Sequence, residues 1–269
     1  MSNDTTGKTL IVATLLCIVC SIVVSTAAVM LKPEQVANKA LDKKKNILAA
    51  AGLLKEGDNV DEMFKRIEIR VVDIATGEYL TESSASEAWQ KAILANPQGY
   101  DQRKAAKMPG QNKVLDGKID TASIKRQAKY AAVYLAKDET GKIDTIILPV
   151  HGYGLWSTLY GFLALKTDAT TVVGLGFYEH AETPGLGGEV DNPKWKAIWP
   201  GKQVFNSDGE LEIEVVKGTI DETTKNPEHK VDGLAGATLT SRGVSNLVNF
   251  WLGENGFGSY LSKVKAKGV

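Results

Sequence analysis

Strand-like runs dominate the second half of the chain, and two short segments, residues 66–73 and 211–216, alternate apolar and polar residues in the two-residue period of β-strands. Near residue 70, Ile67, Ile69 and Val71 share one face of residues 66–73, which predicts a half-buried strand. Residues 130–138 and 142–150 flank a short turn and predict a hairpin. Similar runs predict further strands at residues 158–167, 171–178 and 211–216.

Helical periodicity is clearest near the C-terminus, where the apolar spacing changes to three and four residues. Residues 241–252 predict a helix with Thr240 or Ser241 as its N-cap, and its apolar face comprises Val244, Leu247, Val248 and Trp251. Other helices are expected at residues 33–54, with Gly52 as the stop signal, and at residues 86–94 and 192–199. Strand hairpins with peripheral helices predict an α+β domain built on an antiparallel sheet.

The most apolar stretch lies near the N-terminus. Residues 9–31 carry no charge between Lys8 and Lys32, and as a helix they would extend roughly 34 Å, enough to cross a bilayer. A cleaved signal peptide is the alternative, but its apolar region is usually only about 7–15 residues long. We therefore predict an uncleaved transmembrane helix. Cys17 and Cys20 fall inside it, where packing is the expected role of both side chains.

The predicted organisation is an N-terminal cytoplasmic tail (1–8), a transmembrane helix (9–31), a connecting helix or linker (32–60) and a soluble domain (61–269) whose motifs cluster in residues 149–252. Lysines after the span outnumber those before it, which taken literally would place the domain in the cytoplasm. Large domains cross the membrane largely regardless of flanking charge, so the charges alone leave the orientation open.

Composition excludes several classes of protein. The 269 residues are 43% hydrophobic and 24% charged, which excludes a disordered or disulfide-stapled chain. Lys plus Arg and Asp plus Glu both total 32, so the basic excess of a nucleic-acid-binding protein is absent. The histidines show no metal-ligand spacing, and no hydrolase elbow or phosphate-binding Walker loop occurs. We therefore expect chemistry that depends on a bound cofactor.

Two glycine-rich segments could accept a flat ligand. In residues 149–157, glycines bracket an aromatic residue and Trp156 could form an apolar wall; the alternative is a plain loop between strands with Trp156 in the core. In residues 180–188, a Pro-Gly turn precedes two glycines with unshielded N–H groups, and Glu182 and Thr183 supply polar contacts. His180 is expected to form structural hydrogen bonds.

A third glycine-rich segment, residues 232–241, is built mainly from small residues and precedes the final helix. It places Thr238 where a helix N-terminus presents unpaired N–H groups and the positive end of the helix dipole, an arrangement suited to phosphate. The alternative is a plain helix entry built from small residues.

Taken in order, these segments resemble the family of covalent FMN-binding domains, which includes the C subunits of the bacterial sodium-translocating NADH:quinone reductases. The resemblance is carried by KKKNILAAAGL at 43–53, RVVD at 70–73, HGYGLW at 151–156, HAETPGLGG at 180–188 and DGLAGATLTS at 232–241. In that family, an aspartate, two variable residues and a Ser or Thr precede the Gly-Ala-Thr of the flavin attachment site. Ala235 departs from this pattern but leaves the acceptor threonine intact.

The resemblance implies that Thr238 bears FMN through a phosphoester, attached by a flavin transferase that cleaves FAD. It also implies isoalloxazine contacts from Glu182 and Thr183 at the ring edge and from Trp156 and Leu186 over its faces. Further residues expected to surround the cofactor are Gly185, Gly187, Asp232, Gly236, Ala237, Leu239 and Thr240.

The function implied is that of an electron-transfer subunit in a sodium-pumping complex of the bacterial inner membrane, with the flavin domain in the periplasm. Its partners would be the other subunits, the flavin transferase and the membrane, with no nucleic acid and no metal. The chain itself is expected to bind neither NADH nor sodium. Alternatives are the flavin-carrying G component of the related ferredoxin:NAD complex, a stand-alone membrane-anchored flavin reductase or sensor, or an anchored domain with an empty pocket.

Overall fold

The computed structural model describes residues 5–269, which divide into two compact units between residues 43 and 44. The predicted cytoplasmic tail at 1–8 therefore lies partly, over residues 1–4, outside the described residues. The second unit contains the whole sheet and all three glycine-rich segments.

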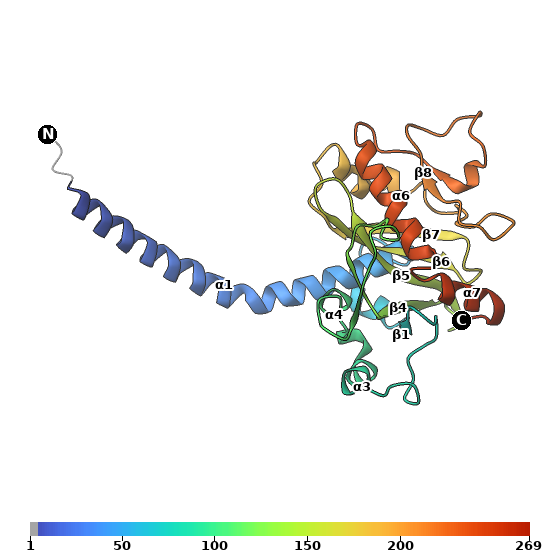
Figure 1. The fold of residues 1–269 in the computed structure, drawn as a ribbon, viewed down its shortest axis with the longest axis horizontal. Coiled ribbons are helices and arrows are strands. Elements are labelled where there is room, and N and C mark those ends of the chain that lie inside the picture. Colours follow the sequence, from blue (N-terminus) through green and yellow to red (C-terminus); the bar gives the residue numbers. More distant parts are fainter. Residues whose placement is uncertain (1–4) are drawn as a thin grey trace. The chain divides into compact units, whose positions relative to one another are not determined.

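Helix α1 (Thr6–Ala50) is long and apolar enough to cross a membrane and contains the predicted span at 9–31 (Figure 1). The sequence predicts a separate helix from Pro33, but α1 continues through Pro33, whose missing N–H costs the helix one internal hydrogen bond. The helix ends at Ala50 and not near Leu54, because Gly52 adopts the left-handed conformation with φ +67°.

The predicted antiparallel sheet is confirmed, with strand order β1-β4-β5-β6-β7. Its strands are β1 (Ile67–Asp73), β4 (Tyr130–Lys137), β5 (Ile143–Tyr153), β6 (Thr158–Lys166) and β7 (Val172–Glu179). Strand β5 runs three residues beyond the predicted end, so His151 and Gly152 belong to the sheet and the connecting loop begins at Gly154.

Helix α6 (Thr238–Leu252) packs against β5 with the predicted apolar face, because Val244, Leu247, Val248 and Trp251 are all buried. Trp251 Nε1 donates a hydrogen bond to the carbonyl of His151 at 2.7 Å. Gly152 permits the close approach, since a Cβ atom added there would lie 2.5 Å from Leu247 Cβ. This contact places the first turn of α6 beside the end of β5.

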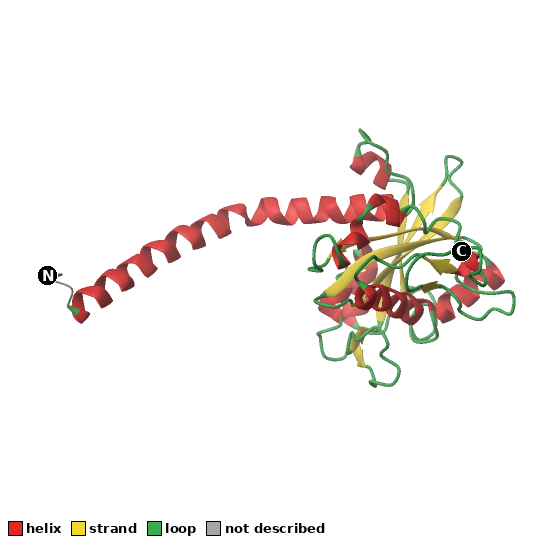
Figure 2. Ribbon diagram, turned by 90° about the horizontal axis from the view of Figure 1, so that it is seen from above, coloured by secondary structure: helices red, strands yellow, loops and turns green. Residues whose placement is uncertain are grey.

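Smaller elements surround the sheet (Figure 2). They are α2 (Val60–Phe64), α3 (Ala88–Ala95), η1 (Pro97–Gly99), α4 (Gln102–Ala105), β2 (Asn112–Val114), β3 (Arg126–Ala128), η2 (Gly187–Asp191), α5 (Pro193–Lys196), β8 (Glu214–Val215), η3 (Pro227–His229), β9 (Lys230–Val231) and α7 (Gly258–Lys267). Helix α7 was not predicted. The strand predicted at 211–216 shrinks to β8, because the Val215 N–H donates to Ser245 Oγ of α6 instead of to a strand.

The C-terminal end of α1 belongs to the second unit and packs on its sheet. Ile47 and Leu48 are buried, and a Cβ atom added at Gly174 in β7 would lie 2.5 Å from the carbonyl oxygen of Ala50. The last turn of α1 is therefore part of the folded domain.

Candidate functional site

The three glycine-rich segments converge at the N-terminus of α6. A Cβ atom added at Gly243 would lie 2.6 Å from the carbonyl oxygen of Tyr153, and one at Gly187 would lie 2.5 Å from Thr240 Oγ1. Gly236 faces Leu186 in the same way, at 3.0 Å from its Cδ2 atom. The glycines thus allow backbone segments to approach more closely than side chains would permit.

Glu182 joins all three segments through its carboxylate. Its Oε1 atom accepts hydrogen bonds from the backbone N–H groups of Leu155 (3.2 Å), Trp156 (3.0 Å) and Ser157 (3.1 Å), and from Ser157 Oγ at 3.2 Å. Its Oε2 atom accepts the hydroxyl of Thr240 at 2.8 Å. The residue is 4% exposed, so these donors replace water around the charge.

Hydrogen bonding keeps the Glu182 carboxylate ionised. Burial by itself would raise its pKa, but the Thr240 hydroxyl and the three backbone N–H groups together hold the pKa below its ordinary value. At neutral pH the site therefore contains a fixed negative charge surrounded by donors from the chain itself.

This environment gives Glu182 a structural role. The sequence suggests a direct contact with the edge of a flavin ring, but both carboxylate oxygens already accept hydrogen bonds from the chain. Glu182 fixes the loop that carries Trp156 relative to the helix turn that carries Thr240. Its direct contact with a flavin ring stays a prediction.

Large apolar side chains surround the start of α6 and remain exposed. Trp156 is 65% exposed and Leu186 45%, so the alternative that placed Trp156 in the core is wrong. The other exposed members of this group are Tyr153, Leu155 and Leu239. Such a cluster, drawn from separate segments, is typical of a surface that binds a ligand or a partner.

Thr238 is the first residue of α6 and is exposed, as an acceptor for modification must be. The N-cap is Ala237, following Gly236 with φ +70°, and not Thr240 or Ser241 as predicted. The two hydroxyls have other partners: Thr240 donates to Glu182, and Ser241 Oγ accepts the N–H of Leu234 at 2.9 Å.

The start of α6 has hydrogen-bonding capacity to spare. Its first bond runs from the N–H of Ser241 to the carbonyl of Ala237, so the N–H groups of residues 238–240 have no acceptor among the described residues. These donors, at the positive end of the helix dipole, favour a negative group attached at Thr238.

Other predicted site residues shape the loops. Asp232 Oδ1 accepts the N–H of Ile220 at 2.8 Å, and the Asp232 carbonyl accepts Trp195 Nε1 at 2.8 Å. Thr183 is exposed, and its carbonyl oxygen accepts the N–H groups of Leu186 (3.1 Å) and Gly188 (2.9 Å), which closes the turn around Gly185, whose φ is +74°. Direct contacts from Thr183, Gly185 and Asp232 to a cofactor stay predictions.

Two residues outside the predicted cofactor contacts also organise these loops. Ser157 Oγ accepts the N–H of Ala181 at 2.8 Å while contacting Glu182, which ties two of the segments together. His180 forms the structural hydrogen bonds expected of it, with Asp191 Oδ2 at 2.7 Å and with the N–H of Glu182 at 3.2 Å. Nothing in the local sequence identifies Ser157, because its partners lie 24 and 25 residues away.

Comparison with protein families and curated proteins gives consistent results. The family described as FMN-binding domain matches residues 154–253. The chain is 51% identical over 268 residues to the C subunit of Na(+)-translocating NADH-quinone reductase from Pseudomonas aeruginosa, covering 98% of each chain. It is 48% identical over 269 residues to the protein of the same name in Vibrio vulnificus, covering 100% of this chain and 99% of the relative.

Solved structures agree with these matches. The crystal structure of Shewanella oneidensis NqrC superposes with a TM-score of 0.75 at 33% identity, covering 86% of this chain and 100% of that chain. The C subunit of Na(+)-translocating NADH-quinone reductase from Parabacteroides distasonis gives a TM-score of 0.59 at 26% identity, covering 87% and 96%. The similarity extends over nearly the whole chain, far beyond the matched FMN-binding segment.

Proposed function

Because the chain belongs to the family of C subunits of Na⁺-translocating NADH-quinone reductases, we propose that its FMN is joined to the hydroxyl of Thr238. The protein is an FMN-carrying electron-transfer subunit of this membrane oxidoreductase. Similarity over the full chain to named C subunits favours this reading over a G-type component or a stand-alone reductase.

One observation carries the attachment site: the exposed hydroxyl of Thr238 stands where three segments bearing exposed apolar side chains meet. A flavin has a flat aromatic ring system with apolar faces and an anionic phosphate, and the residues present fit both parts. Trp156 and Leu186 offer apolar surface for the ring, while the unpaired N–H groups at the start of α6 suit the phosphoryl group.

The chain contributes position and electrostatics. FMN supplies one- and two-electron transfer when bound. Glu182 holds the Trp156 loop and the first turn of α6 in a fixed relation, and Leu239 adds apolar surface beside Thr238. A covalent bond removes cofactor dissociation, which suits a domain outside the compartment where flavins are made.

The membrane assignment combines the finding on α1 with the family name. Helix α1 is a candidate membrane span, and the family works as subunits of a membrane complex. We propose further that the second unit lies in the periplasm, although the lysines following residue 31 favour the other side. A flavin transferase that cleaves FAD is the proposed maturation partner.

Flavin fluorescence in a denaturing gel tests the attachment directly. The full chain and its Thr238→Ala variant are expressed with a flavin transferase in an export-competent bacterium. We expect a fluorescent band for the wild type, loss of it in Thr238→Ala, and retention in the control Thr223→Ala, which removes a hydroxyl from an exposed loop away from α6. A fluorescent Thr238→Ala band would show that another residue is the acceptor.

Orientation and assembly need separate measurements. An alkaline phosphatase fused after Val269 should be active if the domain is periplasmic, and an inactive fusion of normal abundance would place it in the cytoplasm. Affinity purification in mild detergent should recover several polytopic membrane proteins with the chain. Purification of the chain alone would favour a stand-alone flavoprotein.

A further inference from the structure

On the basis of the proposed attachment at Thr238, we propose that Arg242 and Lys217 form an anion site that holds the phosphoryl group linking FMN to the chain. Both residues face a pocket of about 490 Å³ that Thr238 also lines. Neither residue was singled out in the sequence, and the two come from different elements.

The pocket lies along the polar side of α6. Residues three and four apart share one face of a helix, and those of α6 that line the pocket are Thr238, Ser241, Arg242, Ser245, Asn246 and Asn249. The opposite wall is formed by residues 211–217 together with Lys230. Arg242 is therefore one helical turn from the acceptor hydroxyl, on the same face.

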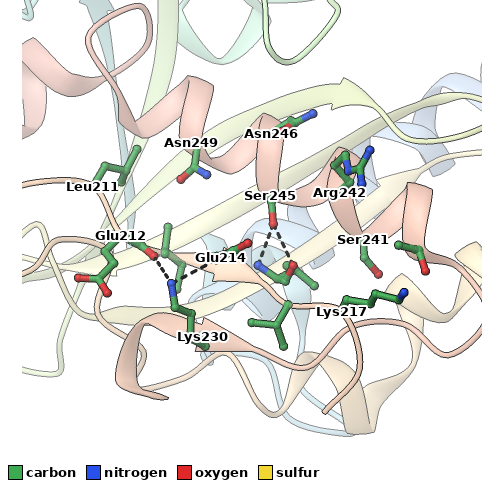
Figure 3. Close-up of a pocket in the computed structure, with 14 residues that line it drawn as sticks. Leu211, Glu212, Glu214, Lys217, Lys230, Ser241, Arg242, Ser245, Asn246 and Asn249 are labelled. Atoms are coloured by element: carbon green, nitrogen blue, oxygen red, sulfur yellow. Dashed lines mark hydrogen bonds and ion pairs between the residues drawn. The ribbon is translucent and has the colours of Figure 1, made fainter. Parts of the chain in front are cut away.

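Charge is distributed unequally within this pocket (Figure 3). At one end, Lys230 Nζ lies 3.2 Å from Glu214 Oε2, and Glu212 accepts a hydrogen bond from Asn226 at 2.6 Å. At the other end, Lys217 and Arg242 make no ion pair or side-chain hydrogen bond within residues 5–269. Two unneutralised cations thus line the same pocket as Thr238.

The backbone around Lys217 is held in place. Ser245 Oγ of α6 accepts the N–H of Val215 at 2.7 Å, and the N–H of Val216 donates to Val231 at 2.9 Å. On the other side, Gly218 accepts the N–H of Gly233 at 2.7 Å. These bonds fix the Lys217 position relative to α6 before any ligand binds, and such preorganisation strengthens binding.

A phosphoryl group matches this site better than the other parts of FMN do. A guanidinium can form two parallel hydrogen bonds to phosphate oxygens, and an ammonium adds a compact charge. A phosphodiester on Thr238 would carry one negative charge in the pocket that these two side chains line. The ring, by contrast, would find its apolar surface on the other segments, at Trp156 and Leu186.

A thermodynamic cycle tests the proposal on the full chain in detergent. Wild type, Arg242→Gln, Lys217→Gln and the double variant are prepared with and without co-expressed flavin transferase, and Tm is measured for each form. Removing the cations relieves their mutual repulsion in the unmodified chain, so its Tm should hold or rise. In the flavinylated chain Tm should fall, which shrinks the gain in Tm on flavinylation.

Two further measurements sharpen the result. Lys230→Gln is the matched control, because Lys230 lines the same pocket but is already paired with Glu214. This substitution should change the Tm of the flavinylated and unmodified chains by the same amount. The ³¹P resonance of the flavinylated chain should move in Arg242→Gln and Lys217→Gln but not in Lys230→Gln. Arg242→Lys should restore part of the lost gain in Tm.

If Arg242→Gln and Lys217→Gln change the Tm of the flavinylated and unmodified chains equally and leave the ³¹P resonance in place, the proposal is overturned. The two residues would then have a structural role only. Inorganic phosphate should raise the Tm of the unmodified wild type but not of the flavinylated chain; equal stabilisation of both would assign the pocket to free phosphate instead. Flavin retained in Thr238→Ala would refute the attachment at Thr238. If Arg242→Gln and Lys217→Gln carry flavin and gain as much Tm on flavinylation as the wild type, only the anion site is refuted.

Discussion

At the scale of single residues, the Glu182 side chain links segments that lie far apart in the sequence. Its carboxylate is buried and satisfies three backbone N–H groups and two hydroxyls from segments distant in the chain. Burial of a charge is unfavourable unless it is compensated in this way. The stability of the site therefore depends on the ionised form of this one residue.

We expect Glu182→Gln to lower the free energy of unfolding by about 1–3 kcal/mol at neutral pH, because an amide cannot satisfy all of these donors. The folded state holds the pKa below the ordinary 4.5, so the advantage of the wild type is present above that pH and is lost as pH falls through the folded-state pKa. Urea unfolding of both proteins across this range measures the difference.

The control for this comparison is Glu222→Gln, because Glu222 is exposed. That variant should unfold like the wild type at every pH. A Glu182→Gln deficit that stayed constant down to acid pH would mean that the carboxylate contributes by shape alone.

Thr240 provides a second test of the same bond from the helix side. The residue is 0% exposed and donates to Glu182 at 2.8 Å. Thr240→Val keeps the shape but leaves a carboxylate lone pair unsatisfied, so we expect a loss of about 1–3 kcal/mol, while Thr240→Ser should lose less. In a double-mutant cycle, Thr240→Val should cost less in the Glu182→Gln background; additive losses would show that the two side chains act independently.

At the scale of elements, the packing of α6 on β5 depends on glycine. Gly243 faces the turn after β5, where an added Cβ atom would lie 2.6 Å from the Tyr153 carbonyl oxygen and 2.9 Å from Gly154 Cα. Because both neighbours are backbone atoms, neither can rotate away. The position of Thr238 relative to the Trp156 loop follows from this contact.

Gly243→Ala should accordingly displace α6 and lower stability by about 1–3 kcal/mol, the usual range for overpacking. Less flavin should be attached at equal expression, because the acceptor turn shifts. Gly176→Ala is the control, since nothing lies within 4 Å of a Cβ atom there. In-gel fluorescence and thermal melting report the two effects; normal melting and normal labelling of Gly243→Ala would mean that the backbone adapts.

The elements that sequence reasoning predicted well are those with strong periodicity. Alternation located β1, the turn between two strand-like runs located β4 and β5, and the spacing of Val244, Leu247 and Val248 located the buried face of α6. Ends were predicted less well, because they depend on tertiary contacts: Thr240 and Ser241 look like N-caps but bond to other segments. Helix α7 was not predicted, because only part of it is apolar.

At the scale of the whole molecule, the boundary of the folded domain falls inside α1. Ile47 and Leu48 are 1% and 0% exposed, whereas the apolar residues of the candidate span are exposed. The last turns of α1, the helix that contains the candidate membrane span, are thus packed into the folded domain.

This boundary predicts different outcomes for two truncations. A chain beginning at Lys44 should fold with a Tm close to that of the full chain, whereas one beginning at Lys55 should lose about 3–6 kcal/mol, because two fully buried aliphatic side chains are removed. Circular dichroism melting of both soluble fragments is the measurement. Equal Tm values would show that residues 44–54 are dispensable for the domain.

The site could be predicted from the sequence only as separate pieces. The segments around Trp156, Glu182 and Thr238 were recognisable, but their convergence follows from the sheet, since Glu182 and Thr240 lie 58 residues apart. Lys217 carried no local signal. The position of Arg242 near Thr238 could have been predicted, because the two residues are four apart and therefore one helical turn from each other.

The Glu182 carboxylate also has a consequence for the order of events in biogenesis. It connects residue 155 to residue 240, so the turn that presents Thr238 reaches its final shape only after the central strands have paired. A transferase that requires this shape would label finished chains and pass over nascent or misfolded ones. Covalent flavin would then serve as a quality-control mark, a lasting record that the domain had folded before it joined its complex.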